Sequence, residues 1–283
     1  MARLAPASAP VDGVDLQVER IRSADGAEVT TYTYRPVNAA ANGPVMLFTH
    51  GGGMIVGSAA GYHATVSAYA RDLGLVVIST EYRLAPENPF PAPLDDVHAA
   101  YLWLLANAAV LDVDPAKIVV AGDSAGGGLT AALCQRLLDS GDPMPLFQLL
   151  IYPMLDDRTT LRPAPANRGQ LIWTEKSNLY GWTSYLGRPP VAEAAPDHAV
   201  PARRQDLSGL PPAWIGVGKL DLFYDEDIAY AHRLRAAGVA CQLDVVEGAF
   251  HGFDLFAKTN VARAFRERSL QAIRDAIART YES

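Results

Sequence analysis

The chain has 283 residues, of which 49% are hydrophobic and 19% charged, and its formal net charge at pH 7 is −7. This composition is typical of a globular protein with a sizeable core, and the acidic balance argues against a nucleic-acid-binding surface. Residues 1–13 lack the apolar stretch of a signal peptide, and no segment has the run of about twenty apolar residues that a membrane-spanning helix needs. We therefore expect one domain over residues 1–283, located in the cytoplasm, with no nucleic-acid or membrane partner.

A hairpin is expected near the N-terminus. Residues 16–21 and 28–34 alternate between apolar and polar types, and Asp25-Gly26 between them is a typical turn pair. Further along, short and nearly continuous apolar runs are typical of strands buried on both faces of a parallel sheet. These runs are residues 45–49, 75–80, 117–121, 147–152, 213–217 and 242–246.

Segments with apolar residues at three- and four-residue spacing separate these strands and predict helices. They are residues 64–73, 93–107, 128–138, 227–237 and 261–279. Alternating strands and helices favour crossovers that place helices on both faces of one sheet. The predicted fold class is therefore α/β, with a mostly parallel central sheet of about eight strands and the hairpin at one edge.

Residues 156–210 interrupt this alternation between two predicted core strands. The segment is rich in proline and contains one amphipathic stretch, residues 171–186. A structureless loop of this length is uncommon inside a compact domain, so we expect a small cap over the ends of the strands. Residues 1–15 are expected to contribute to the same cap.

Residues 122–127, with the sequence GDSAGG, follow a predicted strand and precede a predicted helix. This is the G-x-S-x-G form of a nucleophile elbow, in which small neighbours allow a strained turn where strand and helix approach closely. We predict that Ser124 is a nucleophile. A serine that only caps the helix is the alternative.

Residues 50–53, with the sequence HGGG, also follow a predicted strand. Glycines let backbone N–H groups face a substrate oxygen, and we expect those of Gly52 and Gly53 to join that of Ala125 in an oxyanion hole. His50 is interpreted as a hydrogen-bonding residue that orients this loop, with a role as base as the alternative. A phosphate-binding loop is disfavoured because no P-loop or dinucleotide pattern is present.

In this type of fold the acid and the histidine follow the serine, in that order. His198 falls in the expected cap and His232 in the middle of a predicted helix, whereas His251 lies in a loop directly after the last predicted strand. We predict that His251 is the general base and acid. Activity should then fall on the acid side of neutrality, where the imidazole becomes protonated.

Asp221 comes shortly after the predicted strand 213–217 and is our candidate for the acid that orients His251. Asp225 is the alternative, but with Glu226 it would head the next helix, where carboxylates interact favourably with the helix dipole.

The segment 82–87 shows no chemistry by residue type and is interpreted as a proline-stiffened loop. Cys134 and Cys241 lack metal-ligand spacing and are expected to be buried free thiols, and no metal site is expected.

The motifs together resemble those of the bacterial hormone-sensitive-lipase-like carboxylesterases, α/β-hydrolases of the GDSAG subgroup. The matching segments are residues 50–53 (HGGG), 82–87 (YRLAPE), 122–127 (GDSAGG), Asp221 with 225–226 (DE), and 251–253 (HGF). The resemblance implies a triad of Ser124, Asp221 and His251. It also implies hydrolysis of short- to medium-chain acyl esters without a cofactor, and a homodimer as a common assembly.

Two features depart from the family's pattern. The family usually has proline directly after the catalytic acid, whereas this chain has Leu222. Members also carry more helical turns before the first strand. With a shorter leader, the cap would consist mostly of residues 156–210, and we expect an acyl pocket that is more open than usual.

The resulting hypothesis is a serine carboxylesterase that acts on a small-molecule ester through an acyl-enzyme on Ser124. Alternatives with the same triad are an acetyl-hydrolase, a lactonase, an amidase or a thioesterase. A non-catalytic small-molecule receptor is a more remote alternative, since the plant gibberellin receptors resemble this family but lack the catalytic histidine. His251 is present here, which argues against a receptor.

Overall fold

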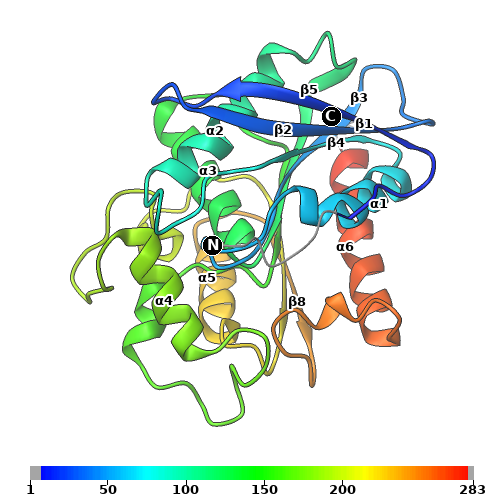
Figure 1. The fold of residues 1–283 in the computed structure, drawn as a ribbon. Helices are drawn as coiled ribbons and strands as arrows, with labels where there is room; N and C mark the ends of the chain where they lie inside the picture. The colour runs from blue at the N-terminus through cyan, green and yellow to red at the C-terminus, as the bar shows by residue number, and fades with distance from the viewer. Residues whose placement is uncertain (1–7, 280–283) are drawn as a thin grey trace.

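One sheet of eight strands forms the centre of the computed structural model, which describes residues 8–279 (Figure 1). The strands are β1 (Val14–Arg22), β2 (Glu28–Pro36), β3 (Gly43–Thr49), β4 (Val76–Thr80), β5 (Val113–Asp123), β6 (Phe147–Ile151), β7 (Ala213–Gly218) and β8 (Cys241–Val246). They lie in the order β1-β2-β4-β3-β5-β6-β7-β8. Neighbours from β4 to β8 run parallel, and the antiparallel β1–β2 hairpin lies at one edge. The predicted hairpin and mostly parallel sheet are confirmed.

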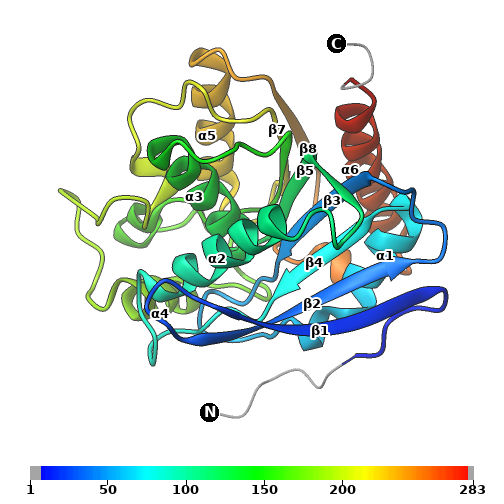
Figure 2. The same ribbon diagram turned by 90° about the horizontal axis from the view of Figure 1, so that it is seen from above.

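Helices cover both faces of the sheet, as predicted (Figure 2). One face is covered by α1 (His63–Leu73) and α6 (Asn260–Arg279), and the other by α2 (Ala92–Ala106), α3 (Ala125–Ser140) and α5 (Tyr224–Ala236). Two apolar clusters, one on each side of the sheet, make up the core. Within residues 8–279, no helix combines the length and apolar character needed to cross a membrane.

Two helices begin three residues before their apolar spacing starts, at residues 128 and 227. The helix α3 begins at Ala125, directly after the elbow, and α5 begins at Tyr224, next to the acidic pair expected to head it. The first turn of α3 is rich in glycine, a weak helix former, and is helical here because it packs tightly against the sheet. The first turn of α5 holds acidic residues, which the helix dipole favours at that end.

The prediction that strand side chains are buried on both faces of the sheet is correct for the central strands but not for β8. In β3, the residues from Val45 to Phe48 are at most 1% exposed. The last strand, β8, lies at the edge of the sheet, and most of its side chains are half-exposed. The predicted burial is therefore wrong for this strand. Cys134 is a buried free thiol, but Cys241 at the start of β8 is only half-buried.

The cap segment, residues 156–210, contains one α-helix and two short 3₁₀ helices. These are α4 (Glu175–Leu186), η2 (Asp157–Leu161) and η3 (Pro201–Arg203). The predicted helix 171–186 was too long at its start. Thr174 is extended and its hydroxyl accepts a hydrogen bond from the backbone N–H of Ser177, so the helix begins after it and residues 171–173 stay outside.

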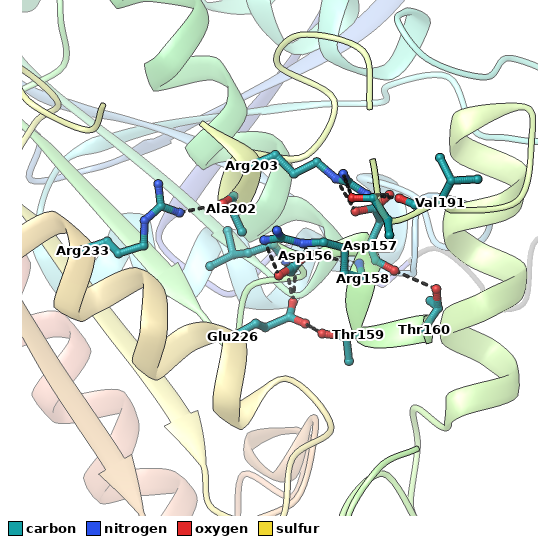
Figure 3. A network of polar contacts seen from close by, with 12 residues as sticks. Asp156, Asp157, Arg158, Thr159, Thr160, Val191, Ala202, Arg203, Glu226 and Arg233 are labelled. Atoms are coloured by element: carbon teal, nitrogen blue, oxygen red, sulfur yellow. Dashed lines mark hydrogen bonds and ion pairs between the residues drawn. The ribbon is translucent and has the colours of Figure 1, made fainter. Parts of the chain in front are cut away.

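Charged side chains hold the two ends of the cap together (Figure 3). Near its end, Arg203 donates from Nε to Oδ1 of Asp157 at 2.7 Å and from Nη2 to Oδ2 at 3.0 Å. Asp157 lies at the cap's start and its side chain is 1% exposed. Arg158 makes a similar fork with Asp156, but its side chain is 41% exposed. The Asp157–Arg203 pair is therefore the more deeply buried of the two.

The cap is also attached to α5, the helix that follows Asp221 (Figure 3). Glu226 on α5 accepts hydrogen bonds from the backbone N–H groups of Leu155 and Asp156 at 2.7 and 3.1 Å. Burial raises the pKa of this carboxyl well above its ordinary value. Arg233, further along α5, donates to the carbonyl of Ala202 at 2.6 Å. Both ends of the cap thus rest on one helix of the core.

The expected contribution of residues 1–15 to the cap stays a prediction. Residues 1–7 lie outside the described part of the chain, and residues 14–15 belong to β1. Between them, Ser8 N–H donates to the carbonyl of Ala60, in η1 (Ala60–Tyr62). Val11 N–H donates to Ser67 Oγ on α1 at 2.9 Å. This stretch therefore lies along η1 and α1.

Candidate active site

Ser124 lies on a sharp turn between β5 and α3. Its φ and ψ are 54° and −120°, a conformation that L-residues rarely adopt and that is found at strained functional turns. Small neighbours make the turn feasible. A Cβ on Gly126 would lie closer than 3.0 Å to the carbonyl oxygen of Thr49, and one on Gly122 would meet the backbone of Gly126. The predicted elbow geometry is therefore present.

His251 lies between Ser124 and Asp221. Its Nδ1 is 2.8 Å from Asp221 Oδ2, and its Nε2 is 2.9 Å from Ser124 Oγ. An ionised carboxylate can only accept, so Nδ1–H donates to Asp221 and Nε2 accepts from the Ser124 hydroxyl. All three residues are buried, and the second oxygen of Asp221 accepts from the backbone N–H of Phe223 at 2.9 Å. Three segments predicted separately thus meet at one point.

The alternative candidates lie elsewhere. Asp225 pairs with Arg168 at 2.7 Å, and its side chain is 67% exposed. His198 pairs with Asp139 at 2.7 Å, and His232 is exposed on α5. Leu222, where the family's pattern has proline, is buried and leaves Asp221 in contact with His251.

The HGGG loop follows β3 and lies against the elbow. Gly52 and Gly53 have φ of 120° and 59°, which glycine adopts freely and other residues rarely do. A Cβ on Gly52 would meet the carbonyl of Val56, and one on Gly53 would clash with the indole of Trp173. The indole of Trp173, a cap residue, therefore lies directly against the HGGG loop. Gly52 and Gly53 follow the carboxyl end of β3, which pairs with the end of β5. Ala125 begins α3 directly after that end of β5 and the elbow.

A sequence profile described as α/β-hydrolase fold matches residues 46–255. The chain belongs to this family. The match covers the HGGG loop, the elbow, Asp221 and His251. The predicted fold class and family resemblance are thereby confirmed.

Similar proteins are ester hydrolases. The carboxylic ester hydrolase LipN of Mycobacterium tuberculosis is 34% identical over 275 residues, which are 95% of this chain and 72% of LipN. The carboxylesterase NlhH of the same species is 36% identical over 265 residues, 92% of this chain and 82% of its own. A bacterial heroin esterase superimposes with a TM-score of 0.88 at 38% identity, covering 94% of this chain and 85% of that one. These relatives agree with the predicted enzyme class, a carboxylic ester hydrolase.

Sequence reasoning missed a role for Asp123 of this α/β-hydrolase. Its Oδ1 accepts from the backbone N–H of Gly51 at 2.9 Å, and its Oδ2 accepts from the hydroxyl of Tyr62 at 2.7 Å. Burial raises the pKa of the Asp123 carboxyl to about 7. A charged residue in a motif that otherwise requires small residues was the signal that could have revealed it.

His50 is placed as an orienting residue, in agreement with the interpretation of its sequence. Its Nδ1–H donates to the carbonyl of Gly51 at 2.8 Å, and its ring stacks on Tyr82 with centroids 4.2 Å apart. Tyr82 in turn donates its hydroxyl to the carbonyl of His50 at 2.9 Å. Ala85 N–H donates to the carbonyl of Met54 at 2.9 Å. The loop 82–87 thus supports the HGGG loop, a contact between distant segments that residue types alone do not show.

Aromatic rings fix the plane of the His251 imidazole. Tyr152 and Phe223 approach it edge-on, with centroids 4.7 and 5.1 Å away. Tyr152 is itself held by donating its hydroxyl to Asp254 Oδ1 at 2.7 Å. The imidazole therefore rests in a packed site in which its two nitrogens point at Asp221 and Ser124.

Proposed function

We propose that this α/β-hydrolase cleaves short- to medium-chain carboxylic esters with Ser124 as nucleophile, His251 as general base and acid, and Asp221 as the orienting acid. One observation carries the proposal. The imidazole of His251 is within hydrogen-bond distance of Ser124 Oγ on one side and of Asp221 on the other, at 2.9 and 2.8 Å. This is the arrangement that activates a serine for attack on a carbonyl.

The reaction would proceed in two halves. Nε2 of His251 takes the Ser124 proton while Oγ attacks the ester carbonyl, and the backbone N–H groups of Gly52, Gly53 and Ala125 hold the resulting oxyanion. The tetrahedral adduct collapses as the C–O bond to the alcohol breaks and His251 gives its proton to the leaving oxygen. Water then hydrolyses the acyl-enzyme by the same route, and the serine is regenerated. Asp221 stays ionised and stabilises the imidazolium.

We also propose that the chain forms a single hydrolase domain with residues 156–210 as its cap. The contacts from Arg203 to Asp157 and from Arg233 to Ala202 support this division, since they bind the cap to itself and to α5. A homodimer and a cytoplasmic location remain expectations from the sequence.

The test is hydrolysis of p-nitrophenyl butyrate by the wild type and by Ser124→Ala. We expect turnover by the wild type and its loss in the variant, with an unchanged melting temperature. A fluorophosphonate probe should label the wild type only. A Ser124→Ala variant that retains most of the activity would overturn the proposal. Comparing kcat/KM for p-nitrophenyl esters, a lactone, an anilide and a thioester then separates the ester substrate class from the alternatives.

A further inference from the structure

Two consecutive cap residues, Ile172 and Trp173, contact the two loops on either side of Ser124. A Cβ on Gly53 would clash with the outer ring of Trp173, so the indole lies directly on the HGGG loop. A Cβ on Gly252, next to His251, would lie 3.5 Å from Cγ2 of Ile172. The peptide that joins these two residues therefore bridges the space between the oxyanion loop and the histidine loop.

The side chain of Trp173 is held in place by burial and by a hydrogen bond. Its side chain is buried, with the residue 9% exposed, and its Nε1–H donates to Oδ1 of Asn178 on α4 at 3.3 Å. Gly181, one turn further along α4, lies so close that its Cβ would be 3.0 Å from the carbonyl oxygen of Gly53 and 3.2 Å from the indole. The tryptophan is thus held between α4 and the loop whose N–H groups face the substrate.

Ile172 differs from Trp173 in both burial and backbone. It is 56% exposed, and its φ of 62° lies in the left-handed region, which is unusual for a β-branched residue. Strain of this kind persists where surrounding structure imposes it, often at ligand-binding positions. Leu255, in η4 (Phe253–Leu255), is 66% exposed and places Cδ1 3.3 Å from the same Cβ position on Gly252. Ile172 and Leu255 form an exposed apolar surface, here called the apolar shelf, beside the catalytic histidine.

The chemistry of the reaction indicates on which side of Ser124 the alcohol and acyl parts of the ester lie. His251 must give its proton to the leaving oxygen, so the alcohol part of the ester lies on the His251 side, next to the apolar shelf. The acyl part would then extend away from His251, toward the HGGG loop and the indole of Trp173 that lies on it. Because the shelf lies against Gly252, next to His251, and is open to solvent, the apolar part of a substrate alcohol is the occupant that fits it.

We propose that Trp173 limits the size of the acyl group and that the apolar shelf of Ile172 and Leu255 binds an apolar alcohol group. The proposal rests on the proposed function. Trp173 closes the acyl side of the site, and only the alcohol side, beside Ile172 and Leu255, opens to solvent. The favoured substrates are esters of small acids with larger apolar alcohols.

The experiment uses two substrate series on the full chain. An acyl series runs from p-nitrophenyl acetate to octanoate, and an alcohol series runs from methyl to butyl and benzyl acetate. Trp173→Ala should raise kcat/KM for octanoate relative to acetate about tenfold and leave the alcohol series unchanged. Trp173→Phe, which lacks the outer ring but still fills the site, should shift the same ratio less. It keeps the test valid if the alanine variant fails to fold.

Ile172→Gly should change the preference among alcohols and leave the preference among acyl groups as in the wild type. Glycine adopts a φ of 62° freely, so the variant should fold, but butyl and benzyl acetate should lose about tenfold in kcat/KM relative to methyl acetate. The acyl series should not change. Leu161→Ala is the matched control, an apolar cap residue that is 46% exposed, and should alter neither ratio.

The outcomes separate this inference from the function on which it rests. Unchanged acyl ratios in a folded Trp173 variant, or unchanged alcohol ratios in Ile172→Gly, overturn the inference while the wild-type activity stands. Parallel losses on every substrate also overturn it, because they indicate a purely structural role. A wild type that hydrolyses none of these esters overturns the proposed function, and the inference with it.

Discussion

The carboxylate of Asp123 accepts a hydrogen bond from the backbone N–H of Gly51 at 2.9 Å, which joins two motifs 72 residues apart in the chain. Asp123 directly precedes Ser124, and Gly51 directly precedes the glycines proposed for the oxyanion hole. One side chain therefore fixes the nucleophile to the loop that supplies two of its three proposed oxyanion donors. Tyr62 holds the second oxygen of the same carboxylate at 2.7 Å.

The first prediction concerns this link. Asp123→Ala removes the acceptor of Gly51 N–H, and we expect kcat to fall about a hundredfold with little change in KM, because the oxyanion donors lose their position. Asp123→Asn keeps an acceptor oxygen and should lose much less. Steady-state kinetics on p-nitrophenyl butyrate measure both. Equal losses in the two variants, or a loss confined to KM, would contradict a positioning role.

The same carboxyl should make stability depend on pH. Burial raises its pKa from the ordinary 3.8 to about 7, so between these values the folded state holds a proton that the unfolded state has released. Its contribution to stability is therefore full below about pH 4 and is lost as the pH rises to about 7. Urea unfolding of wild type and Asp123→Asn from pH 4 to 8 should show their difference in free energy of unfolding falling over that window. A constant difference would refute the assignment.

The third prediction distinguishes the two candidate acids. Asp221→Asn should lower kcat about a thousandfold or more, because an amide can no longer hold the imidazole tautomer that accepts the Ser124 proton. Asp225→Asn, the matched control, removes a carboxylate that is 67% exposed and pairs with Arg168, and it should leave kcat within about twofold. Both are measured with p-nitrophenyl butyrate at neutral pH. A larger loss in Asp225→Asn would reverse the assignment.

The fourth prediction concerns the ion pair that joins the two ends of the cap. Arg203→Met leaves the buried carboxylate of Asp157 without its partner, and we expect the free energy of unfolding to fall by about 3 kcal/mol or more. Arg158→Met breaks a similar but more exposed fork with Asp156 and should cost less than about 1 kcal/mol. Urea denaturation of both variants gives the comparison. Similar costs would mean that the depth of the Asp157–Arg203 pair does not matter.

The sheet and the elbow could be predicted because each depends on residues close together in the chain. The apolar run before Gly122, the small residues after Ser124 and the loop after β8 that carries His251 are local patterns, and the order of strands then brings their ends together. The burial of β8 was mispredicted because an apolar run does not show whether a strand lies at the edge of a sheet.

The contacts that complete the site could not be predicted, since they join distant segments. Asp123 reaches Gly51, and Tyr82 stacks on His50 only once the loops meet in space. The cap shows the same limit. The periodicity of residues 171–186 predicted one helix, but the N-cap at Thr174 leaves Trp173 in a bend before the helix, where its indole reaches the HGGG loop. A helical pattern carries no information about such a docking contact.

The last prediction tests that docking contact. Gly53 and Gly141 both have positive φ, 59° and 73°, so alanine strains the backbone at either position. Around Gly141 a new Cβ meets nothing within 4 Å, whereas at Gly53 it clashes with Trp173. Gly141→Ala should therefore cost about 1 kcal/mol of stability and no activity, while Gly53→Ala should also lower kcat about tenfold or more.

A second substitution identifies the cause of that loss. If the clash with Trp173 displaces the loop, Gly53→Ala combined with Trp173→Ala should recover part of the kcat, so that the two changes are not additive. Adding Trp173→Ala to Gly141→Ala gives the control, for which we expect additive effects because the two sites share no contact. Additive effects in the Gly53 pair would show that the loop responds to backbone strain alone and that Trp173 does not press on it.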